Sequence, residues 1–209
     1  PRTNFKFKLG DKELTTVGQS KYLGVVLNEF VDYNVTAKLL ADAGNRALGA
    51  VISRYKAMNG LGYYTFSKLH NAGVCPILDY CGEIWGFKDF SQINCIQHKA
   101  MRVYLGVHRF APVAAMSGDM GWTSSIVRRK VSMFRFWNRL IKMDQERLTH
   151  FIFEWDLSLD ANYTWSSDIK SLFHAIDKDE IFAQRQCLPT NTAWALLHEQ
   201  FCTEWADLV

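Results

Sequence analysis

The chain has 209 residues, of which 48% are hydrophobic and 14% aromatic, so a substantial core can form. No run of 18 apolar residues occurs, which excludes a membrane-spanning helix. The net charge of +3 is unevenly distributed: residues 96–147 hold ten Lys and Arg against three Asp and Glu, whereas residues 148–209 hold three against ten. The basic middle predicts a polyanion-binding surface, although attraction between the two halves within one fold explains the pattern equally well.

The first 30 residues are expected to form short antiparallel strands. Apolar and basic residues alternate from Phe5 to Leu9, which is the two-residue period of a half-buried strand. Gly10 and Asp11 can turn the chain into a second strand that returns over 14–17. A third strand is expected over 21–27, which is rich in residues that favour strands.

Helices are expected from residue 34 onwards, beginning with 34–58, where apolar residues recur at helical spacing. A second helical region, 64–85, contains Pro76, which should kink or break it. A third helix, 89–105, should end at Gly106, and Pro112 should open a short helix.

The expected helix over 123–143 has one basic and one apolar face. At 100° per residue, its basic face collects Arg128, Arg135, Arg139 and Lys142. Arg129 is placed on the flank of this face. Further helices are expected over 145–157, 166–176 and 191–206. The fold class is therefore mainly α, a helical bundle with further linking helices and a small N-terminal antiparallel β-hairpin or sheet.

Three sequence blocks carry a resemblance to a known family. The first is Tyr22-Leu23-Gly24-Val25, and the second is Pro-Ile-Leu-Asp-Tyr-Cys-Gly-Glu-Ile-Trp-Gly over 76–86. The third combines Ile-Gln-His-Lys-Ala-Met-Arg over 96–102 with Leu-Gly-Val over 105–107. In order and spacing, these blocks resemble non-LTR (LINE-type) retrotransposon reverse transcriptases, from the primer grip to the helical region after the palm.

The resemblance implies a division of the chain into three parts. Residues 1–30 would be the end of the palm with the primer grip, 31–110 a helical thumb, and 111–209 a helical linker or connection region. The expected partners are RNA, an RNA–DNA hybrid or DNA, together with the palm, fingers and endonuclease that are absent here. A start at Pro1 likewise favours a piece of a longer polypeptide.

The chain is not expected to be an enzyme on its own. Polymerases of this family hold Mg²⁺ with palm carboxylates that include an Asp-Asp pair, and no such pair occurs in this sequence. Asp177 and Asp179 are interpreted as a solvated helix end. We therefore expect no catalytic residue and no cofactor in this chain, with Mg²⁺ in the absent palm.

No metal site is expected either. The spacing of Cys75, Cys81, Cys95 and His98 fits structural zinc poorly, because zinc sites favour ligand pairs two to four residues apart. Five cysteines, an odd number, without a secretory leader indicate free thiols. We therefore expect an intracellular protein of the nucleus or the cytoplasm.

Two groups of residues are candidate nucleic-acid sites. The primer grip would comprise Tyr22, Leu23 and Gly24, where a glycine within a strand admits the sugar-phosphate backbone of the primer. A basic surface would hold the template–product duplex by its phosphates. Its candidate residues are Lys99, Arg102, His108, Arg109, Arg128, Arg135, Arg139 and Lys142.

The alternative is a domesticated or remnant helical module that binds proteins and has no nucleic-acid activity. Acidic cover over the basic face, by residues such as Glu154, Asp156 or Asp168, would favour this alternative. A further expectation concerns the strand over 5–9, which would normally pack against the absent palm. It should therefore be poorly supported, mobile, or a site of self-association.

Overall fold

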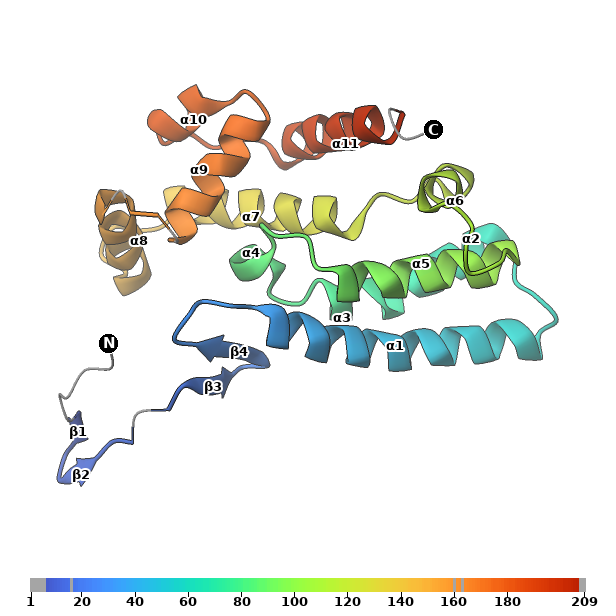
Figure 1. The fold of residues 1–209 in the computed structure, drawn as a ribbon. Coiled ribbons are helices and arrows are strands. Elements are labelled where there is room, and N and C mark those ends of the chain that lie inside the picture. Colours follow the sequence, from blue (N-terminus) through green and yellow to red (C-terminus); the bar gives the residue numbers. More distant parts are fainter. Residues whose placement is uncertain (1–6, 16, 160, 163, 207–209) are drawn as a thin grey trace.

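The computed structural model describes residues 7–15, 17–159, 161–162 and 164–206. The expected fold class is confirmed, because the described chain is mainly helical with two small antiparallel hairpins at its N-terminal end (Figure 1). Phe5, part of the expected first strand, lies outside the described residues. Among the described residues, no helix is both long enough and apolar enough to cross a membrane.

The first hairpin pairs β1 (Lys8–Leu9) with β2 (Lys12–Glu13). Gly10 makes the expected turn in the left-handed region, with φ +60°. Both strands are exposed, and the first is shorter than predicted. The returning strand was expected over 14–17, but it lies at 12–13, because the turn at Gly10 and Asp11 is tight and pairing starts directly after it. The exposed Phe7 and Leu9 agree with the expectation of poor support.

The single strand expected over 21–27 is wrong, because this segment lies within a second hairpin. It pairs β3 (Gln19–Tyr22) with β4 (Val25–Asn28), and Tyr22 lies opposite Val25. Leu23 and Gly24 form the two-residue turn between them, with φ of 45° and 90°. Positive φ at both positions matches the twist of the flanking strands, so the chain reverses where a continuous strand was predicted.

α1 (Asn34–Ala57) is the longest helix and runs along one side of the molecule (Figure 1). It begins at the first residue of the predicted range and stops one residue before the predicted end. Asn59 then takes a left-handed conformation, and the Gly60 N–H donates to the Tyr55 carbonyl at 2.9 Å. These features define a Schellman ending.

The helical region around Pro76 is interrupted, as predicted. Its pieces are α2 (Tyr63–Gly73), α3 (Cys75–Leu78) and α4 (Gly82–Trp85). Next come α5 (Ser91–Leu105), which ends at the left-handed Gly106 as predicted, and α6 (Val113–Met120), which follows Pro112.

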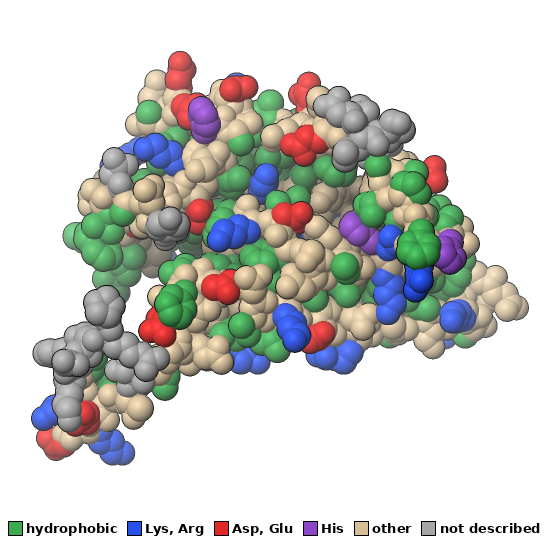
Figure 2. Space-filling model, in the orientation of Figure 1, with side chains coloured by type: hydrophobic (Ala, Val, Ile, Leu, Met, Phe, Trp, Pro, Cys, Tyr) green, Lys and Arg blue, Asp and Glu red, His purple; other side chains and the backbone are tan. Residues whose placement is uncertain are grey.

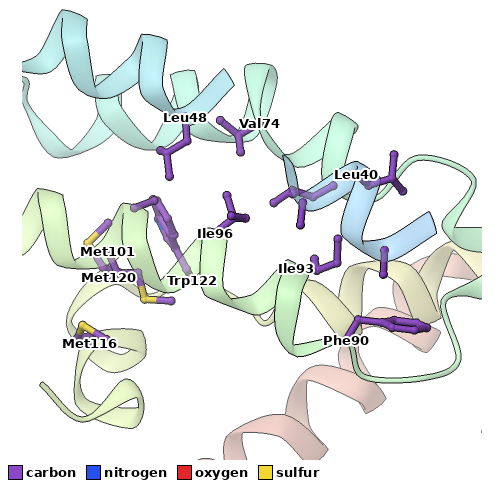
Figure 3. Close-up of a cluster of buried hydrophobic side chains, with 14 of the residues drawn as sticks. Leu40, Leu48, Val74, Phe90, Ile93, Ile96, Met101, Met116, Met120 and Trp122 are labelled. Atoms are coloured by element: carbon purple, nitrogen blue, oxygen red, sulfur yellow. The ribbon is translucent and has the colours of Figure 1, made fainter. Parts of the chain in front are cut away.

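α1, α2, α3, α5 and α6 enclose a first hydrophobic cluster. Figure 3 shows Met101, Met116 and Met120 beside Trp122, with Leu48 on α1 and Val74 at the junction of α2 and α3 facing them. Because α6 supplies two of these methionines, the cluster extends past residue 110. The domain boundary at 110/111 stays a prediction, but buried side chains pack across it.

A second cluster is built around α7 (Ser125–Ile141), whose apolar face is buried as predicted. The surrounding helices are α8 (Leu148–Leu159), α9 (Trp165–Ala175), α10 (Asp179–Ala183) and α11 (Thr190–Ala206). Trp137 is fully buried at its centre and packs against Phe153 and Phe173. In Figure 1, α7 lies between α1, α3 and α5 below it and α9 to α11 above it.

Candidate nucleic-acid interface

The tip of the second hairpin presents Tyr22 and Leu23 to solvent, at 66% and 72% exposure. Tyr80, from the second sequence block, is hydrogen-bonded to the backbone of the tip. Its hydroxyl donates to the Leu23 carbonyl at 2.8 Å. A Cβ on Gly24 would lie 3.1 Å from the Tyr80 ring. Gly24 was expected to admit a primer backbone within a strand, but it lies in a turn and the group close to it is this ring.

The inner strand of the hairpin is attached to α1. Val25 and Val26 are buried, and the Val26 N–H donates to the Thr36 hydroxyl at 2.9 Å. The same hydroxyl donates to the Val26 carbonyl at 3.2 Å. The exposed tip therefore projects from a backbone that is fixed at two points.

Arg128 is an internal ion-pair residue rather than part of an open basic face. Its Nε donates to Asp79 Oδ2 at 2.7 Å, and its side chain is 26% exposed. Its Nη1 also donates to Gln97 Oε1 and to the Thr123 carbonyl, both at 3.2 Å. Arg128 shares a face of α7 with Arg135 by spacing, but its pairing with Asp79 distinguishes it from the open cation that the sequence predicted.

Arg129 was placed on the flank of the basic face, but it is completely buried. Its guanidinium lies 5.2 Å from the centre of the Trp85 ring, and Nη1 lies 3.7 Å from Asp79 Oδ1. A Cβ on Gly86 would lie 2.7 Å from Arg129 Cβ, so this glycine leaves room for the arginine. Burial lowers the pKa of Arg129 to about 10, while nearby Asp79 opposes the shift.

The three sequence blocks thus contact one another directly or through α7. Tyr80 of the second block bonds the first, and Asp79 of the second block bonds Arg128. Gln97 of the third block bonds Arg128 and also donates to the Thr123 carbonyl at 3.0 Å. The sequence analysis quoted these positions within motifs but missed their roles, and no local signal distinguishes Asp79, Tyr80 and Gln97 from the other polar residues of the blocks.

The remaining cations of the predicted α7 face, Arg135, Arg139 and Lys142, are exposed. Within the part of the chain that the structure describes, none of them forms an ion pair. Arg135 and Arg139 border a shallow hollow of about 230 Å³ that Ser132, Phe136 and Glu83 also line. Three of the four predicted positions are therefore available to a polyanion.

A second cationic group lies on α5 and the loop after it. Lys99 is exposed and donates to Asn45 Oδ1 on α1 at 2.8 Å, whereas Arg102 is half-buried. His108 and Arg109 are exposed, and the Arg109 guanidinium lies 4.6 Å from the centre of the exposed Phe110 ring. Figure 2 shows basic and histidine side chains gathered around the far end of α5. Sequence reasoning missed Phe110, although a ring next to two basic residues is a recognisable stacking signal.

The two cationic groups do not form one continuous surface. The α7 group lies toward the C-terminal end of α7, near α8, whereas Lys99 to Arg109 lie toward the C-terminal end of α5 (Figure 1). Sequence reasoning combined them in one surface. The structure instead places one group at each side of the molecule, with Arg128 and its partners between them.

Among the described residues, the three acidic side chains expected as possible cover form no ion pair with the α7 group. Glu154 pairs with Arg185 at 2.5 Å, and Asp156 accepts from the Ser166 N–H at 2.9 Å. Burial raises the pKa of Asp168 to about 6, although nearby Lys88 acts against the shift. The acidic cover that would have favoured the protein-binding alternative is not formed by these three residues.

His70 and Cys75 form a buried pair that the sequence analysis did not predict. The His70 ring stacks on Trp122 with centroids 4.2 Å apart, and Cys75 Sγ lies 3.5 Å from His70 Nδ1. Burial lowers the pKa of His70 to about 4 and raises that of Cys75 to about 11. Both side chains are therefore neutral near pH 7 and serve packing. Among the described residues, no three His, Cys, Asp or Glu side chains come together as a metal site.

Comparisons with protein-family models, with curated proteins and with solved structures find no match to this chain. The resemblance to non-LTR reverse transcriptases therefore rests on the quoted residues and stays a prediction.

Proposed function

We propose that this chain is a non-catalytic nucleic-acid-binding part of a retrotransposon RNA-directed DNA polymerase. Its α7 and α5 cations would hold the phosphates of an RNA–DNA hybrid, and the tip of the second hairpin would contact the primer end. The observation that carries the proposal is the exposure of Arg135, Arg139 and Lys142, which form no ion pair among the described residues, although Glu83 lines the hollow beside the two arginines. Cations on a rigid helix bind phosphates without reading base sequence.

The hairpin tip supports the second half of the proposal. Tyr22 offers an exposed ring and Leu23 an exposed aliphatic side chain, and Tyr80 fixes the backbone beneath them. A rigid turn with exposed apolar side chains is suited to packing against the terminal sugar and base of a primer. Replacing Tyr22 with alanine should weaken binding to a recessed 3′ end more than binding to a blunt duplex.

The test of the proposal is a salt series of binding to a fluorescent RNA–DNA hybrid duplex. Three phosphate contacts by the α7 group contribute about 2.7 to the slope of log K against log salt. Between 50 and 200 mM salt, that part of the slope corresponds to about a 40-fold loss of affinity. The triple variant Arg135→Ala, Arg139→Ala, Lys142→Ala should bind more weakly and lose this part of the slope.

A matched control removes three exposed cations of α1 instead: Arg46→Ala, Arg54→Ala and Lys56→Ala. These residues belong to neither cationic group, so the salt slope should change much less. Absence of binding at low salt by the folded wild-type chain would contradict the proposal. So would an α7 variant that keeps the full wild-type slope.

A further inference from the structure

α8 carries a row of large apolar side chains that point into solvent. They are Leu148, Phe151, Ile152, Trp155 and Leu159, and each is between 45% and 74% exposed. The helix is held to the second cluster by the opposite side, where Phe153 is buried and Leu157 half-buried. In Figure 2, hydrophobic side chains gather at the left edge of the molecule, over α8.

The row has the geometry of a core-facing helix surface. At 100° per residue, its five members fall within an arc of about 100°, the width of the stripe by which amphipathic helices usually pack. Leu148, Ile152, Trp155 and Leu159 follow one another at spacings of four, three and four. Alternation of these spacings is typical of the seam between paired helices. No charged residue interrupts the stripe.

We propose that a second copy of this chain covers the stripe, with two α8 helices pairing antiparallel about a two-fold axis. The five side chains leave on the order of 600 Å² of apolar surface open. That area approaches the roughly 800 Å² that each partner contributes to a stable interface. A homodimer needs a patch that complements itself, because the same surface is used twice.

The stripe meets that requirement in one antiparallel register. Leu148 of one copy lies opposite Leu159 of the other, and Ile152 lies opposite Trp155, so a small side chain faces a large one at both central positions. Arg147, which is exposed next to the start of α8, then lies near the C-terminal end of the other helix. Because the C-terminal end of a helix dipole is negative, this contact favours the antiparallel arrangement.

The test uses the full chain without nucleic acid, in sedimentation velocity over a concentration series. We expect a dimer with a dissociation constant on the order of 10 µM. Ile152→Lys and Trp155→Glu each place two unpaired charges in the interface and should weaken dimerisation about 100-fold or more. Both side chains are exposed, so circular dichroism should report an unchanged fold. Tyr64→Glu, at an equally exposed aromatic residue on α2, is the control and should leave the dimer intact.

Mixing the two variants tests the register itself. In the antiparallel pair, Lys introduced at 152 faces Glu introduced at 155 of the other copy, while the second contact keeps its wild-type side chains. The equimolar mixture should therefore recover the dimer that neither variant forms alone. A mixture that stays monomeric overturns the antiparallel register. A wild-type chain that stays monomeric to about 200 µM, whether or not it pellets with phosphatidylserine vesicles, overturns the whole proposal.

Discussion

Replacing Asp79 with asparagine is expected to destabilise the fold strongly, because this carboxylate compensates two arginines on α7. Its Oδ2 lies 2.7 Å from Arg128 Nε, and its Oδ1 lies 3.7 Å from Nη1 of the fully buried Arg129. An asparagine would keep the shape but remove the negative charge, which leaves a buried guanidinium without a counter-charge.

The magnitude follows from the burial of the three groups. Removing one partner of a buried ion pair costs about 3–5 kcal/mol. The side chains of Asp79 and Arg128 are 15% and 26% exposed, so water offsets part of that loss, and we expect about 3 kcal/mol. For a chain of this length, that change corresponds to a melting temperature about 6–12 °C lower.

The assay is urea unfolding followed by tryptophan fluorescence, with Asp42→Asn, an exposed carboxylate on α1, as the control. Adding Arg129→Met to the Asp79 variant removes the uncompensated charge and should recover much of the lost stability. If the Asp79 variant loses less than about 1 kcal/mol, the carboxylate does not compensate the arginines and the reasoning is wrong.

Three smaller perturbations test other parts of the fold. Tyr80→Phe removes the hydroxyl that bonds the hairpin tip and should cost about 0.5–1 kcal/mol, seen as faster amide exchange over 19–28; unchanged exchange would contradict it. Gly44→Ala should lower the free energy of unfolding by about 1–3 kcal/mol, because the new Cβ would lie 2.3 Å from a methyl carbon of the buried Leu78. Gly49→Ala in the same helix is the control: its Cβ meets nothing within 4 Å, so it should raise the free energy of unfolding by about 0.5–1 kcal/mol. In the folded chain the pKa of His70 is about 4, below its unfolded value near 6.5. The stability that neutral His70 contributes to the fold is therefore fully present above pH 6.5 and is lost as the pH falls toward 4, by up to about 3 kcal/mol. His70→Phe should remove that part of the pH dependence, and equal unfolding curves of the two proteins from pH 7 to 4 would argue against it.

Local sequence signals predicted the helices well because each signal acts on its own neighbours. Gly106 ended α5 in the left-handed conformation, and Pro112 opened α6, as their backbone preferences require. The hairpin turn escaped notice because Leu23 is an unusual residue at positive φ, and the residues around it favour strands.

The candidate site was predicted only in part, since periodicity identifies a face of one helix and not what covers it. Arg128 and Arg135 share a face of α7 by spacing, yet only Arg128 meets a carboxylate, from a residue 49 positions earlier. Nothing in the sequence near Arg128 signals that partner. The separation of the α5 and α7 cationic groups depends in the same way on how distant helices pack.

Asp79 and Tyr80 are consecutive residues that bond in different directions, one to α7 and the other to the tip of the second hairpin. Their Cα atoms are about 3.8 Å apart, and a peptide unit between them resists twisting. A displacement of the hairpin tip that pulls on Tyr80 is therefore carried through a single peptide unit to Arg128. The hairpin and α7 are mechanically in series, although Leu23 and Arg128 lie 105 positions apart in the sequence.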